Sequence, residues 1–139
     1  MLNIAIVRSS YYDNLVSSME KSAKDVLLES GIPEENIIVV KVPGSFEISL
    51  VCQKIAKEGK VDGIIALGII INGQTHHAEE IARACTDGLM QTQLATGIPI
   101  AHEVLYVDSK KHAEDRSIGE KNRGGEAGRT LLKMISIIQ

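Results

Sequence analysis

Several residue types and patterns are scarce in this chain, and each absence argues against a class of protein. Only 3 % of the 139 residues are aromatic and none is Trp, so the stacking platforms of RNA-binding proteins are not expected. Basic residues number 15 against 18 acidic ones, whereas dedicated nucleic-acid-binding proteins normally carry a basic excess. The longest apolar run, residues 63–71, is too short to span a bilayer. We therefore expect neither a nucleic acid nor a membrane as partner.

Cysteine is also rare. Cys52 and Cys85 are the two cysteines, and they lie inside amphipathic patterns without forming a spaced motif. Such sparse usage is typical of a reducing compartment. The first ten residues show neither the charged start nor the cleavage pattern of a signal peptide. These features predict a cytoplasmic protein.

The usual nucleotide and metal motifs are absent as well. Neither a Walker A pattern nor a G-x-G-x-x-G fingerprint occurs, which disfavours a nucleoside triphosphate or a dinucleotide as ligand. His102 and His112 have no metal-ligand spacing. His76 and His77 are adjacent, and on a helix such neighbours point about 100° apart, so they are poor joint ligands of one ion. We predict no metal site.

Length and hydrophobic periodicity predict one α/β domain over residues 1–139. The apolar runs 2–7, 37–42, 63–71 and 98–107 are continuous rather than alternating, which indicates strands covered on both faces of a parallel sheet. Helical periodicity follows each run. The expected fold is a three-layer α/β/α sandwich with a four-stranded parallel sheet, flavodoxin-like.

Capping residues predict where the helices begin and end. Asp13 and Ser45 each suit the N-cap of a helix, and two further helices begin near Ser109 and at about Asn122. The stop signals are glycines, at positions 31, 59 and 97.

Polar residues follow every predicted strand. The segments Arg8–Tyr12, Val42–Glu47, Asn72–His77 and Tyr106–Ser109 carry aromatic, hydroxyl, carboxylate and imidazole groups. In open parallel sheets ligands bind outside the carboxyl ends of the strands. We therefore expect a site at that edge of the sheet.

Several residues at this edge have two interpretations. Gly73-Gln74-Thr75 precedes a helix and suits either an anion site or an ordinary turn capped by Thr75. His77 is either a general base oriented by Glu79 or Glu80, or an exposed histidine at a helix start.

The remaining candidates also have two interpretations. Arg116 and Arg123 flank a charged segment that is either a solvated loop or a guanidinium clamp on a phosphate. Tyr11 and Tyr12 either stack on a flat ring or pack against the helix start. The apolar stretch 135–138 suggests burial against a partner subunit.

Three segments together carry a resemblance to a known family. They are Val42–Ile48, Ala66 through His77, and Gly88 through Pro99. With them, the chain resembles the 6,7-dimethyl-8-ribityllumazine synthase family of riboflavin biosynthesis from Ile4 to Ile135. The resemblance implies a transferase that joins 5-amino-6-ribitylaminouracil to 3,4-dihydroxy-2-butanone 4-phosphate. It implies no cofactor, because the amine of one substrate is the nucleophile.

The resemblance also implies roles for individual residues. Tyr11 would stack on the pyrimidine, and His77 would carry protons. The other implied substrate-binding residues are Ser45, Phe46 and Glu47 for the ribityl chain, Gln74, Thr75 and Arg116 for the phosphate, and His102 and Arg123 near the site. His102 matches an aromatic that reaches in from a neighbouring subunit. The resemblance thus implies a homo-oligomer built on pentamers, with the active site between adjacent subunits and an icosahedral capsid as one possible assembly.

This chain departs from the family pattern at several places. Ala78 follows His77 where many members have an aromatic, and His102-Glu103 replaces an aromatic-Gly pair. The loop 116–122 is one residue short, and Arg123 stands where members normally have Lys. Two other functions remain open at this point. They are a paralogous riboflavin synthase, and a non-catalytic flavin-binding or shell protein on the same scaffold.

Overall fold

The computed structural model describes residues 1–139 and contains one sheet of four parallel strands. The strands are β1 (Ile4–Ser9), β2 (Ile37–Val42), β3 (Gly63–Ile71) and β4 (Ile100–Val107). Their order in the sheet is β2-β1-β3-β4. This matches the first four strands of the flavodoxin-like order. The expected parallel, flavodoxin-like sheet is confirmed.

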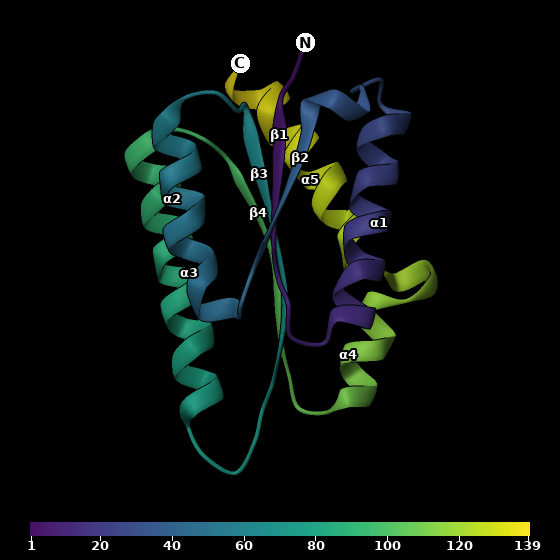
Figure 1. Cartoon of the computed structure of the whole chain (residues 1–139), viewed down its shortest axis with the longest axis vertical. Coiled ribbons are helices and arrows are strands. Elements are labelled where there is room, and N and C mark those ends of the chain that lie inside the picture. The colour runs from purple at the N-terminus through teal and green to yellow at the C-terminus, as the bar shows by residue number, and fades with distance from the viewer.

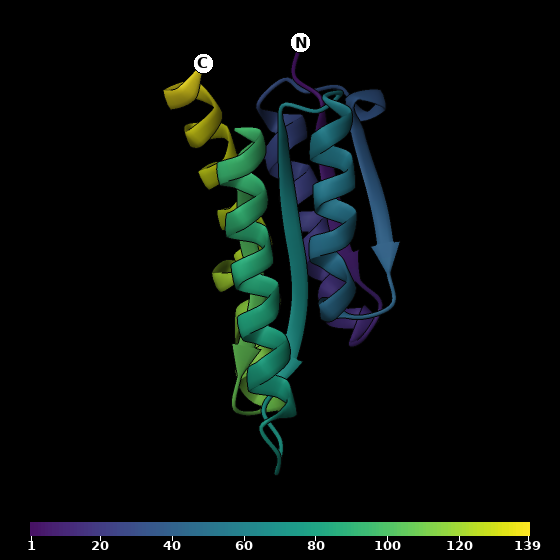
Figure 2. The ribbon, with the colours of Figure 1, turned by 90° about the vertical axis from the view of Figure 1, so that its left-hand side faces the viewer.

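Helices cover both faces of this sheet. They are α1 (Asp13–Glu29), α2 (Ile48–Glu58), α3 (His77–Thr96), α4 (Lys110–Ser117) and α5 (Arg123–Ile138). Figure 1 shows α2 and α3 on one face and α1, α4 and α5 on the other. Seen from the side, α2 and α3 run next to each other in front of the strands (Figure 2). No helix combines the length and apolar character needed to cross a membrane.

The strands are apolar throughout because each face of the sheet has its own core. Ile4 and Ile6 of β1 pack in the cluster under α1 and α5. Ala5 and Val7, which point the opposite way, pack in the cluster under α2 and α3. All six residues of β1 are buried. This two-sided burial explains why the strands do not alternate between apolar and polar residues.

Most predicted helix ends are confirmed. Gly59 and Gly97 end α2 and α3 in the left-handed conformation. The Ser109 hydroxyl accepts a hydrogen bond from the backbone N–H of His112, and the Asn122 side chain accepts one from Gly124. Local capping chemistry therefore defines these ends.

The prediction that Asp13 caps the first helix is wrong. The cap position is Tyr12, which has φ 55° and makes no side-chain cap bond. Asp13 is the first helical residue, and its carboxylate instead pairs with Arg8 and Lys41. These two cations hold the carboxylate that would otherwise accept from the helix backbone.

Two further boundaries differ from the sequence-based expectation. Ser45 does not cap α2, because Ser45–Glu47 form a separate 3-10 turn, η2. The Glu47 carboxylate instead accepts a hydrogen bond from the Gly44 N–H at 2.9 Å. Strand β4 begins at Ile100 rather than residue 98, because Pro99 has no N–H to donate to the sheet.

Candidate functional site

A pocket of about 730 Å³ opens at the carboxyl edge of the sheet. The turns after β1 and β2, the end of β3 and the first turns of α3 line it. Of the site residues that the resemblance implies, it contains Tyr11, Ser45, Phe46, Glu47 and His77. Nine of its fourteen lining residues are hydrophobic. An apolar pocket with a few converging polar groups is the usual form of a small-molecule site.

Tyr11 forms one wall of this pocket. Its side chain is 68 % exposed, so its ring is open to a ligand. The ring lies against Gly44, where an added Cβ atom would come within 3.1 Å of the Tyr11 Cε2 atom. A side chain at position 44 would therefore push the ring away. The Gly44 N–H is held by Glu47, so the loop under the ring is fixed.

Beside this wall, Ser45 and Phe46 differ in exposure. Ser45 is buried, whereas the Phe46 ring is 62 % exposed. A Cβ atom added to Gly68 of β3 would lie 2.7 Å from the Ser45 hydroxyl and 3.2 Å from the Ser9 hydroxyl. The Ser9 hydroxyl is buried without a hydrogen-bond partner. Two serine hydroxyls thus converge on the same glycine of β3, next to Ile69, which lines the pocket.

His77 is the first residue of α3 and lines the opposite side of the pocket. Of the two carboxylates expected to orient it, that of Glu79 lies 3.6 Å from the His76 imidazole. Glu80 lines the same pocket as His77. The His77 side chain is exposed, so its imidazole can exchange protons with a ligand.

Gln74 and Thr75 lie in the turn just before α3. Both are exposed, and the Thr75 hydroxyl accepts from the His77 N–H at 3.4 Å. The N-terminus of a helix favours negative charge. The turn therefore offers a position for an anion next to His77, while neither residue belongs to the pocket lining.

Arg116 and Arg123 lie on the other side of the sheet from α3. Arg116 belongs to α4, and its guanidinium donates to the His112 carbonyl. Arg123 is the first residue of α5, and its guanidinium lies 3.5 Å from the Glu126 carboxylate. They line a separate polar depression that shares no residue with the pocket of Tyr11 and His77. One chain therefore does not bring these two arginines to His77.

His102 and Glu103 of β4 also lie outside the Tyr11 pocket. The His102 Nε2 atom is 2.8 Å from the Thr86 hydroxyl of α3, and burial lowers the pKa of this imidazole. Glu103, the next residue along the strand, points to the opposite face. There burial and the Glu126 carboxylate raise its pKa to about 7, while Arg123 partly opposes the shift.

Sequence reasoning missed one feature next to the site. Arg8 is only 4 % exposed and lies at the end of the apolar strand β1. A single charged residue at the end of a continuous apolar run was the available signal, because a buried guanidinium requires carboxylate partners. The unpaired hydroxyl of Ser9 had no comparable signal.

The sequence matches a known protein family along its whole length. That family is described as 6,7-dimethyl-8-ribityllumazine synthase, and the match covers residues 1–139. The chain is 36 % identical over 137 residues to a curated 6,7-dimethyl-8-ribityllumazine synthase from Halorhodospira halophila, covering 97 % of this chain and 87 % of that protein. Among solved structures, a de novo designed Rossmann-fold protein aligns with TM-score 0.48 and 16 % identity. That alignment covers 82 % of this chain and 92 % of the designed one.

Proposed function

Because this chain belongs to the 6,7-dimethyl-8-ribityllumazine synthase family, we propose that it catalyses the reaction for which the family is named and does so in the Tyr11 pocket. The chain is an enzyme of riboflavin biosynthesis, a transferase that forms 6,7-dimethyl-8-ribityllumazine. Its substrates are 5-amino-6-ribitylaminouracil and 3,4-dihydroxy-2-butanone 4-phosphate. The observation that supports this site best is the presence of Tyr11, Glu47 and His77 around one apolar pocket.

Each of these residues has a role that suits its surroundings. The exposed Tyr11 ring stacks on the flat pyrimidine, while Ser45 and Glu47 bind hydroxyls of the ribityl chain. Phe46 covers the outer side of that chain. His77 moves protons between the reacting amine, the carbonyl oxygen and water. The substrate amine itself attacks the carbonyl, so the protein contributes by holding two reactants together.

The phosphate of the second substrate requires cations that one chain does not bring to the pocket. Gln74 and Thr75 supply backbone N–H groups beside His77, whereas Arg116 and Arg123 belong to α4 and α5 on the other face. We propose that the arginines, together with His102, come from an adjacent subunit. The active site then lies between subunits of a homo-oligomer built on pentamers.

Exposed apolar side chains support such an assembly. Leu50 of α2 and Leu94 of α3 are 73 % and 79 % exposed, and Ile137 and Ile138 of α5 are more than half exposed. Large apolar side chains gathered on helices favour contact with another subunit.

We propose that the protein is located in the cytoplasm. The free thiols of Cys52 and Cys85 agree with such a reducing compartment.

Direct turnover tests the proposed function. The purified protein is mixed with both substrates, and the yellow lumazine is followed by its absorbance against the uncatalysed reaction. We expect product to form well above that background. Binding of both substrates without product would favour the flavin-binding or shell protein. Conversion of the lumazine itself to riboflavin would favour the paralogous riboflavin synthase.

A further inference from the structure

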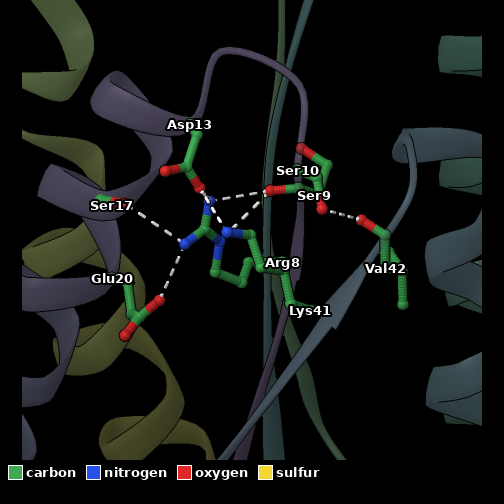
Figure 3. Close-up of polar contacts among 8 residues, drawn as sticks. All are labelled: Arg8, Ser9, Ser10, Asp13, Ser17, Glu20, Lys41 and Val42. Carbon is green, nitrogen blue, oxygen red and sulfur yellow. Dashed lines mark hydrogen bonds and ion pairs between the residues drawn. The ribbon is translucent and has the colours of Figure 1, made fainter.

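A buried guanidinium lies directly beneath the turn that carries Tyr11. Arg8 follows the apolar residues Ile4–Val7 of β1, and its side chain points to the α1 face of the sheet (Figure 3). Its five N–H donors are all used. They donate to the Ser9 carbonyl at 3.2 and 3.0 Å, to the Ser17 hydroxyl at 3.2 Å, to Glu20 at 3.2 Å and to Asp13 at 2.5 Å. A guanidinium has five such donors, so Arg8 is fully satisfied.

The partners of Arg8 lie on both sides of the turn. Asp13, Ser17 and Glu20 are spaced along one stripe of α1, on the face turned toward β1. The Ser9 carbonyl belongs to the strand. The guanidinium therefore joins the last residues of β1 to the first two turns of α1. The residues between them, 10–12, are closed into a short loop.

The same loop is also attached to β2. Lys41 donates to the Asp13 carboxylate at 2.8 Å. The backbone N–H and the hydroxyl of Ser10 both donate to the Val42 carbonyl, at 2.8 and 2.9 Å. Hydrogen bonds from Lys41 and Arg8 hold the pKa of the Asp13 carboxyl below its usual 3.8. The loop thus keeps these attachments down to acidic pH.

Two observations show that the turn needs this support. Tyr12 has φ 55°, a left-handed conformation that residues with a Cβ atom rarely adopt. Tyr11 is 68 % exposed, so core packing does not hold its ring. The position of the ring against Gly44 therefore depends on the backbone of the turn.

We propose that Arg8 is a positioning residue, which fixes the turn between β1 and α1 so that the Tyr11 ring is held at the pocket wall before ligand arrives. The role rests on the proposed function, because it assigns to Tyr11 the binding of a flat heterocycle. Lysine at position 8 would keep the charge. It would lack the planar fork that bonds Ser9 and α1 together.

A double-mutant cycle tests the connection to Tyr11 in the full-length protein. Affinity for 6,7-dimethyl-8-ribityllumazine is measured by fluorescence titration for the wild type, R8K, Y11L and the double variant. We expect R8K to weaken binding roughly 10-fold when Tyr11 is present, and to change it less than about 2-fold when position 11 is Leu. Equal losses in both backgrounds would overturn the proposal, since a general loss of stability does not depend on Tyr11.

Two further variants provide a control for R8K and an alternative to it. K24M removes a charge from the same helix, where Lys24 pairs with Glu34 at 3.2 Å far along α1 from the turn, and we expect unchanged affinity. D13N is used if R8K does not fold, because Arg8 then keeps Glu20 and the carbonyl of Ser9. D13N should also weaken binding only in the presence of Tyr11, and equal weakening in both backgrounds would overturn the proposal.

Hydrogen exchange separates this inference from the proposed function. We expect R8K to speed exchange of the Ser10 backbone N–H, which is bonded to the Val42 carbonyl, by at least about 10-fold relative to the strand β3. Unchanged exchange would overturn the positioning role. A wild-type protein that does not bind the lumazine would contradict the proposed function. The exchange rates would still decide whether Arg8 fixes the turn.

Discussion

His77 and Arg116 lie on opposite faces of the central sheet, His77 at the start of α3 and Arg116 near the end of α4 (Figure 1). Their surroundings form two separate pockets without a shared residue. A single chain therefore does not bring the two residues into one pocket, in agreement with the proposal that the active site is shared between subunits.

This separation predicts complementation between two variants that are each impaired. His77→Ala and Arg116→Ala subunits, unfolded together and refolded as a mixture, form some sites with His77 from one subunit and Arg116 from the next. Random assembly gives about one quarter intact sites, so we expect about that fraction of wild-type turnover. Activity equal to the mean of the two separate variants would contradict a shared site.

Arg116→Ala should mainly affect the phosphorylated substrate. Loss of a charged hydrogen bond to phosphate predicts a KM for the butanone phosphate raised roughly 10- to 100-fold. The KM for the pyrimidine should change little. Lys110→Ala is the matched control, because it removes a charge from the same helix outside both pockets. An equal rise in KM for both substrates would contradict a role of Arg116 in binding the phosphate.

His77→Ala should slow turnover moderately. A proton carrier contributes on the order of 10²-fold at most when substrates are already held together, so we expect kcat to fall by up to that factor. His76→Ala is the control, since His76 is adjacent in sequence, lies near Glu79 and does not line the pocket. An unchanged kcat in the His77 variant would indicate that His77 is only an exposed residue at the start of the helix.

The raised pKa of Glu103 predicts that the stability of the protein depends on pH. Its pKa in the folded protein is about 7, against a usual 4.5. Between these values the folded chain retains a proton that the unfolded chain has released, so the free energy of unfolding decreases as the pH rises. Glu103→Gln should therefore be more stable than the wild type at pH 8 and equally stable at pH 4.

Chemical unfolding at the two pH values measures this difference. Glu58→Gln, an exposed position on α2, should show no such dependence. If Glu103→Gln were no more stable than the wild type at pH 8, the half-buried carboxyl would not be destabilising.

Gly124 allows α5 to pack closely against α1, so a larger residue at this position should destabilise the fold. A Cβ atom there would overlap the Met19 carbonyl oxygen and come within 2.8 Å of its Cα atom. Backbone cannot move aside as a side chain can, so Gly124→Ala should lower the free energy of unfolding by roughly 3 kcal/mol. Gly125→Ala is the control, because its Cβ would meet no backbone atom but only the Ser22 hydroxyl, the end of the flexible Arg129 side chain and, at 3.7 Å, the Val26 side chain. Equal stability of both variants would contradict the close backbone contact.

Local patterns in the sequence are enough to predict the order and type of the helices and strands. Continuous apolar runs marked β2 and β3 at their observed bounds, and Gly59, Gly97 and Ser109 marked helix ends. These signals are local, because periodicity and capping involve residues a few positions apart. The fold class followed from them. The resemblance of whole segments supplied the family, which the comparisons confirmed.

Which side chains meet depends on the packing of the whole chain. Asp13 suits a helix cap in sequence, yet Arg8 and Lys41 take its carboxylate, because the sheet places β1 and β2 beside the start of α1. The crossovers likewise put His77 and Arg116 on opposite faces. Contacts of this kind depend on how helices pack across a sheet, which no local pattern encodes.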